Sequence, residues 1–302
     1  MTTSRTALAV GIAILVAGVA AAAWVLSAPR PIDPETARAV SAPGDPGAGK
    51  IVFFLAGCDS CHMSPGQTDP LRLGGGRELK TPFGSFFPPN ISPDRADGIG
   101  AWSAVDFANA LMAGVSRDGG HLYPAFPYPS YARMSVDDVR NLFAFLKTAP
   151  PVSGRAPADR LGFPFSIRRA LGFWKLLYMP AVRPVAAAPA DPQDRGRYLV
   201  EGPGHCGECH TPRTFLGGPV ESRRLTGAPL PDGKGKAPDI TAAGLGDWSD
   251  SDIAYALSTG FTPSGDSLGG PMAAVVRNLG QVPQGDLNAI THFLKTVRPA
   301  AP

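Results

Sequence analysis

The sequence predicts an all-α protein that contains two tandem copies of one helical unit behind an N-terminal membrane-spanning helix. Three observations carry this prediction. An uncharged run lies near the N-terminus, one cysteine motif occurs twice, and the segments that follow the two motifs resemble each other. Alternating β-branched residues are scarce, so a β-rich fold has little support. A chain of 302 residues is long enough for two domains.

The N-terminal run is long enough to cross a lipid bilayer. From Ala7 to Leu26 there are 20 residues without a charge, and a helix of that length spans about 30 Å. Arg5 before the run favours a cytoplasmic N-terminus. A cleaved signal peptide is the alternative, although Pro29 disfavours cleavage after Ala28. We therefore assign residues 1–28 as an anchor or signal segment, and the Pro- and Ala-rich residues 29–46 as a tether.

The four cysteines form two identical motifs, each followed directly by a histidine. The first motif is Cys58-Asp-Ser-Cys61-His62 and the second is Cys206-Gly-Glu-Cys209-His210. Two thiols one helical turn apart suit the two vinyl groups of one porphyrin, and the adjacent histidine suits its iron. A single copy could also be a redox dithiol or half of a zinc site. Two copies in an exported chain predict two covalently bound haem c groups.

Matching segments after each motif indicate a duplicated unit. Pro89-Asn-Ile-Ser92 is matched by Pro238-Asp-Ile-Thr241, and Gly98-Ile-Gly-Ala-Trp-Ser103 is matched by Gly244-Leu-Gly-Asp-Trp-Ser249. Each serine is followed three residues later by an aspartate, a pattern typical of a helix N-terminus. These helices should end at Gly114 and Gly260. Further helices are predicted over 136–147 and 284–297 from their apolar spacing, so the units span 47–152 and 193–302.

Residues 153–192 connect the two units and concentrate positive charge. They contain six basic and two acidic residues among several aromatic and aliphatic ones. This segment is either a strap packed over one unit or an interfacial segment on anionic lipid. The net charge of the whole chain is only +3, too small to indicate a nucleic-acid partner. No Gly-rich phosphate loop or Ser/His/Asp arrangement is present.

With these motifs, the sequence resembles the multihaem cytochrome c subunits of bacterial membrane-bound alcohol, aldehyde and gluconate dehydrogenases, and their stand-alone two-haem relatives. The resemblance runs from about Gly47 to Val297. It implies class I cytochrome c domains, covalent haem, His/Met ligation and a periplasmic location. The chain departs from the family in carrying two motifs where the dehydrogenase subunits usually carry three. The motifs that carry the resemblance are Leu79-Lys-Thr-Pro-Phe-Gly84, Pro89-Asn-Ile-Ser-Pro-Asp94, Leu122-Tyr-Pro-Ala-Phe-Pro-Tyr128 and Arg197-Tyr-Leu-Val-Glu-Gly202.

The histidines His62 and His210 are the expected proximal iron ligands. His205 and Met63 adjoin their motifs too closely to reach a distal face, and His292 is expected to be structural. For the second haem, Met272 follows Gly269-Gly-Pro271 and supplies a thioether on a rigid loop. The family's corresponding methionine in the first unit is replaced by Phe126 here. The resemblance then favours Met134 as distal ligand, with His121 or an open site as alternatives.

Electron transfer is the function expected of two six-coordinate haems, so we do not expect an enzyme. The expected route leads from a periplasmic or membrane-bound dehydrogenase to a soluble cytochrome, a terminal oxidase or quinone. The protein should lie at the inner membrane, anchored by one helix, with its haem domains in the periplasm. The alternative is a haem redox enzyme of the peroxidase or thiosulfate-oxidising type. That alternative requires an open or unusually ligated first haem.

Overall fold

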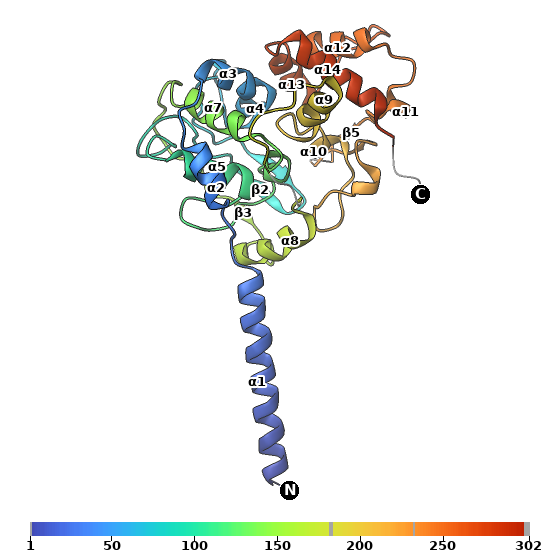
Figure 1. Ribbon diagram of the computed structural model, residues 1–302. Coiled ribbons are helices and arrows are strands. Elements are labelled where there is room, and N and C mark those ends of the chain that lie inside the picture. The colour runs from blue at the N-terminus through green and yellow to red at the C-terminus, as the bar shows by residue number, and fades with distance from the viewer. Residues whose placement is uncertain (1, 181–183, 232, 299–302) are drawn as a thin grey trace.

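The computed structural model describes residues 2–180, 184–231 and 233–298, with side chains from residue 6 onward. Parts of the predicted connecting segment (181–183) and of the second unit (232 and 299–302) lie outside the described residues. Helix α1 (Thr2–Leu26) projects as a rod from a body of short helices (Figure 1). The body holds two hydrophobic core clusters, one for each half of the chain.

The N-terminal half forms around two helices that cross closely. Helix α3 (Pro46–Leu55) packs against α7 (Val136–Leu146). At the crossing, a Cβ on Gly49 would lie 1.9 Å from the carbonyl oxygen of Asn141, so only glycine allows this approach. The remaining helices of this half are α2 (Pro34–Val40), α4 (Cys58–His62), α5 (Ala104–Ala113) and α6 (Tyr128–Tyr131).

The C-terminal half repeats this crossing. Helix α9 (Pro192–Glu201) packs against α14 (Gln284–Thr296). A Cβ on Gly196 would lie 2.0 Å from the carbonyl oxygen of Ala289, the counterpart of the Gly49 contact. The other helices of this half are α10 (Gly207–His210), η2 (Glu221–Arg223), α11 (Ala242–Leu245), α12 (Asp250–Thr259) and α13 (Met272–Leu279).

The predicted helix boundaries agree with the structure to within a residue or two. Helices α5 and α12 begin after Ser103 and Ser249, and each serine forms a reciprocal capping box with the aspartate three residues later. Both helices end at a left-handed glycine, Gly114 and Gly260. Residues 29–46 were predicted to be a tether, but they contain the helix α2. Val40 of that helix is fully buried in the N-terminal core.

Short strands accompany the mainly helical fold and were not predicted. Strands β1 (Leu79–Thr81), β2 (Gly84–Phe86) and β3 (Arg160–Leu161) form an antiparallel sheet in that order. Leu79 pairs with Phe86, and Gly84 pairs with Leu161. Strands β4 (Ala228–Pro229) and β5 (Lys236–Ala237) form an antiparallel pair in the C-terminal half. Segments this short carry no alternating pattern, so periodicity could not reveal them.

The connecting segment lies at the base of the body. After β3 it forms a 3-10 turn, η1 (Arg168–Ala170), and helix α8 (Leu171–Tyr178). Figure 1 shows α8 beside the end of α1, where that helix meets the body. Among the described residues, α1 is the one helix that is long and apolar enough to cross a bilayer, and the apolar stretch that qualifies it has no buried residues.

Candidate haem-binding sites

The two cysteine motifs each occupy one short helical turn. Helix α4 begins at Cys58 and includes Cys61 and His62, while Cys206 directly precedes α10. No disulfide joins any of the four cysteines. Burial raises the pKa of the Cys58 thiol and raises the pKa of Cys206 to about 12. A redox dithiol needs a lowered thiol pKa, so this environment gives that alternative no support.

Each motif histidine is held in the same orientation by a backbone carbonyl. The Nδ1 of His62 donates to the carbonyl oxygen of Pro89 at 2.8 Å, and the Nδ1 of His210 donates to that of Pro238 at 2.7 Å. Burial lowers the pKa of both imidazoles, which keeps them neutral. A neutral histidine that donates through Nδ1 leaves Nε2 as a metal ligand, and the carbonyl fixes the ring direction.

The repeated Pro-Asn/Asp-Ile motif has a structural role that the sequence did not reveal. In each copy, the amide of the motif isoleucine, Ile91 or Ile240, donates at 2.9 Å to a leucine carbonyl, that of Leu73 or Leu225. The next residue's amide donates to the motif side chain: Ser92 to Asn90 and Thr241 to Asp239. These bonds hold the proline carbonyl in place for the motif histidine. The recurrence of the motif at nearly the same distance after each histidine, 27 and 28 residues, was the signal available for this role.

Two lysines that sequence reasoning missed fasten the following loop. Lys147 donates to the carbonyls of Ile99 and Gly100 at 3.1 and 2.7 Å. Lys295 donates to those of Gly246 and Trp248 at 3.0 and 2.8 Å. Lys147 directly follows α7, and Lys295 lies in the last turn of α14. The Gly-x-Trp segment is therefore bound to the C-terminal end of the corresponding helix in both copies. Charge-assisted bonds of this kind are among the stronger ones in proteins.

The geometry fits a haem attached through two thioethers. Each half offers two cysteines on one turn and a neutral imidazole whose Nδ1 donates to a backbone carbonyl. Within the described part of the chain, no three His, Cys, Asp or Glu side chains gather as a metal-ion site. The zinc alternative for these cysteines therefore gains no support.

The two halves differ on the distal side. The Leu122 amide donates to Gly114 O and the Leu268 amide to Gly260 O, which places the two loops in register. Counting four residues onward reaches Phe126 in one loop and Met272 in the other. Met272 begins α13 and is partly exposed, whereas the side chain of Met134 is fully enclosed in the N-terminal core.

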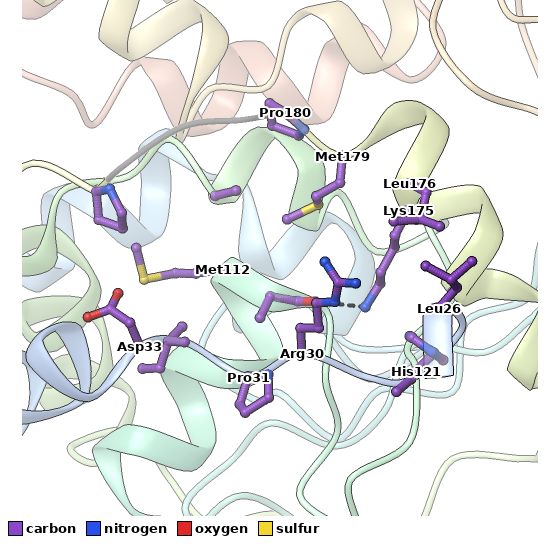
Figure 2. A pocket seen from close by; sticks show the side chains of 16 residues that line it. Leu26, Arg30, Pro31, Asp33, Met112, His121, Lys175, Leu176, Met179 and Pro180 are labelled. Carbon is purple, nitrogen blue, oxygen red and sulfur yellow. Dashed lines mark hydrogen bonds between the residues drawn. The ribbon is translucent and has the colours of Figure 1, made fainter. Parts of the chain in front are cut away.

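His121 faces the end of α1. Its Nε2 donates to the carbonyl oxygen of Ser27 at 2.9 Å. It also lines a cavity of about 320 Å³ between the chain after α1 and helix α8 (Figure 2). None of the motif cysteines, motif histidines, Met134 or Met272 lines that cavity. Two further histidines were not expected to bind iron. His292 is exposed, and His205 donates through Nε2 to Ala56 O, which joins the two halves.

The two motifs contact each other's half reciprocally. The fully buried Asp59 of the first motif accepts from Arg277 at 2.7 Å and from Asn278 at 2.6 Å, both on α13. Glu208 of the second motif accepts from the Ser130 hydroxyl of α6 at 2.9 Å. Nothing in the sequence pattern predicted this interface.

Comparison with known proteins agrees with this geometry. The cytochrome c family model matches residues 47–150. A dihaem cytochrome c-type protein of Cereibacter sphaeroides is 47% identical over 97% of this chain and 98% of its own length. The fructose dehydrogenase cytochrome subunit of Gluconobacter japonicus is 39% identical over 82% of this chain, and the cytochrome c subunit of the alcohol dehydrogenase (quinone) of Gluconobacter oxydans is 38% identical over 84%. The chain spans about half the length of these two subunits, 52% and 55%.

Proposed function

The chain belongs to the dihaem c-type cytochromes, and from this we propose that it takes electrons from a membrane-associated dehydrogenase and delivers them to a respiratory acceptor. The family assignment confirms the predicted resemblance, the two covalently bound haem c groups and a role in electron transfer. The relatives named for dehydrogenases are the cytochrome subunits of those complexes. The chain is therefore an electron carrier and not the catalytic subunit.

The observation that carries this function is the pair of matched histidines. In each half, a proline carbonyl orients the ring of a buried, neutral imidazole beside two thiols on one turn. When bound, each haem supplies a one-electron iron couple. We assign Cys58, Cys61 and His62 to one haem, and Cys206, Cys209 and His210 to the other. The chain orients these groups through the hydrogen bonds of the proline carbonyls, and the electron-transfer chemistry itself belongs to the haem.

Met272 and Met134 are our proposed distal ligands. Met272 is supported by its position after Gly269-Gly-Pro271, at the start of a helix and partly open to its surroundings. Met134 is proposed because Phe126 occupies the position where the resembling cytochrome subunits carry a methionine, so another residue has to supply the ligand. His121 is the weaker rival, because its Nε2 already donates to Ser27 at the end of α1.

The proposed organisation is two tandem cytochrome c domains, 47–152 and 193–302, outside the inner membrane. Two separate core clusters and the matched crossings at Gly49 and Gly196 support two domains. The exposed apolar surface of α1 supports a membrane-spanning anchor. The cytochrome domains then lie in the periplasm, the compartment where haem c is attached in the relatives that the sequence resembles.

A dehydrogenase is the proposed electron donor because fructose, alcohol and gluconate dehydrogenases use relatives of this chain as subunits. A soluble cytochrome, a terminal oxidase or quinone is the proposed acceptor. The test is substrate-driven reduction in native membranes. Membranes from the parent strain and from a strain lacking the gene should be given alcohols, aldehydes, sugars and gluconate in turn. At least one substrate should reduce c-type haem in the parent only.

Purification of the tagged full-length chain from the same membranes should recover a dehydrogenase subunit. Reduction of equal extent in both strains with every substrate would contradict a dehydrogenase donor. Ready binding of carbon monoxide at one ferrous haem of the purified chain would instead favour the redox-enzyme alternative, because an open coordination site is what that alternative requires.

A further inference from the structure

The connecting segment exposes several large apolar side chains at the base of the molecule. We call this surface the strap face. Its members come from residues 163–177, and their exposed fractions lie between 41% and 83%. Large apolar side chains exposed together, unlike single ones, mark a contact surface. The strap face consists of Phe163, Phe165, Ile167, Phe173, Leu176 and Leu177.

Helix α8 is oriented so that Phe173, Leu176 and Leu177 are exposed, whereas the ammonium group of Lys175 points into the protein. Lys175, which points into the cavity of Figure 2, donates through Nζ to the carbonyls of Ala113 and Gly114, each at 2.7 Å. Burial lowers its pKa to about 8. Trp174 is also buried and donates through Nε1 to Leu216 O at 3.0 Å. These anchors fix the rotation of α8, so the outward position of Phe173, Leu176 and Leu177 is built into the fold. A helix facing water would show the reverse pattern.

The strap face adjoins the end of α1. A Cβ on Gly172 would lie 2.3 Å from Ser27 O, so α8 is packed directly against the chain that leaves α1. Arg169 donates to Trp24 O at 2.5 Å and to the Ser27 hydroxyl at 3.0 Å, and its guanidinium lies 4.0 Å from the Trp24 ring centroid. Val25 and Leu26 are exposed as well. The exposed apolar end of α1 therefore lies beside the strap face.

The charge of this segment suits phospholipid headgroups. Between Asp159 and Asp191 the sequence has no acidic residue, while it has five basic ones. Arg168 begins η1 and is exposed. Its Nη1 donates to His121 O at 2.9 Å and its guanidinium lies 4.8 Å from the Tyr123 ring centroid, which holds the group in place while its other N–H donors can still reach a phosphate. Apolar side chains interleaved with arginine are the composition of an interfacial membrane segment. Phosphate groups pair well with guanidinium.

We propose that the strap face is a second membrane contact, which lies in the interfacial layer of the same bilayer that α1 spans and binds anionic phospholipid through Arg168. This proposal rests on the proposed membrane span of α1 and goes further. Two contacts, one spanning and one lying flat, hold the body at a fixed tilt above the bilayer. The cytochrome halves then present the same side to a membrane-associated partner.

Photocrosslinking of the full-length chain tests this proposal. The photoreactive residue p-benzoylphenylalanine replaces Leu177 in one variant and Tyr255 in another. Tyr255 is a similarly exposed residue in the C-terminal half, at 56% against 66%. A third variant carries it at Leu15 within α1. After illumination in native membranes and in vesicles of phosphatidylcholine with phosphatidylglycerol, mass spectrometry identifies what is attached. An unchanged haem spectrum confirms that each variant is folded.

We expect lipid adducts from position 177 and from position 15, and several-fold fewer from position 255. Omission of phosphatidylglycerol should lower the yield at position 177 several-fold and leave position 15 unchanged. Lipid adducts at 15 without any at 177 would overturn the strap-face proposal while leaving the anchor intact. Adducts at 177 to a dehydrogenase subunit or to a second copy of the chain would also overturn it. Failure at position 15 as well would overturn the membrane span.

Discussion

The two halves of this cytochrome are nearly identical on the proximal side and different on the distal side. Both halves use a glycine at the helix crossing, a proline carbonyl on the histidine and a lysine on the Gly-x-Trp loop. On the distal side, Met272 stands partly exposed after a glycine-rich loop, while Phe126 takes its place in the N-terminal half. The repeat therefore keeps the contacts that hold each motif histidine, while one position carries methionine in one half and phenylalanine in the other.

Removal of one cysteine pair should have the largest effect. The variant with Cys58→Ser and Cys61→Ser should lose one haem and keep the other, and the variant with Cys206→Ser and Cys209→Ser should do the same. The reason is that the two motifs are built into separate cores. Haem staining of denatured protein and its mass measure the outcome. Loss of both haems from either variant would show that the halves do not mature independently.

Substitution of each proposed thioether ligand tests whether the two haems differ in their distal ligand. Oxidised haem with histidine and methionine ligands has a weak sulfur-to-iron absorption band in the red, and methionine ligation raises the haem potential. Met272→Ala should remove about half of that band and lower one potential, with Met134→Ala removing the rest. His121→Ala is the matched control and should leave the band intact. If His121→Ala alters the spectrum and Met134→Ala does not, the first haem has two histidine ligands.

The helix crossing is the same in both halves, so substitution of Gly49 and of Gly196 should lower the free energy of unfolding by similar amounts. Gly49→Ala and Gly196→Ala each place a Cβ about 2 Å from a carbonyl oxygen, and overpacking of this kind costs about 1–3 kcal/mol of unfolding free energy. Gly285→Ala lies on α14 with open space around it and should change stability by less than about 1 kcal/mol. Thermal unfolding followed through the haem absorption measures all three. Equal stability in all of them would mean that the crossing is not tightly packed.

The interface between the halves should show a smaller effect. Asp59→Ala leaves Arg277 and Asn278 without their shared acceptor. The Arg277 side chain is 54% exposed, so water compensates part of the loss, and we expect about 1–2 kcal/mol. Limited proteolysis within 153–192 should become faster, because the halves separate more readily. The exposed pair of Lys80 and Glu78, which lies outside the segment, is the control, and Lys80→Ala should leave cleavage within the segment nearly unchanged.

The sequence predicted the parts of this molecule that depend on local chemistry. The cysteine motifs, the capped helices after Ser103 and Ser249, and the apolar helix near the N-terminus follow from residue type and spacing. The Asp59 contact with Arg277 could not be predicted, since it joins residues 218 positions apart. The packed helix within 29–46 was also missed, because a seven-residue helix rich in alanine shows no clear period. Its stability comes from tertiary contacts of Val40 and Thr36.

The mass of the unfolded full-length chain tests the central claim most directly. Two covalent haem c groups, one in each half, require the 31.4 kDa polypeptide plus two haems, with any cleaved leader subtracted. The account predicts that both haems remain attached after acid and denaturant treatment, because thioether bonds survive such treatment. A mass with a single haem, or haem extracted by acid, would contradict the account.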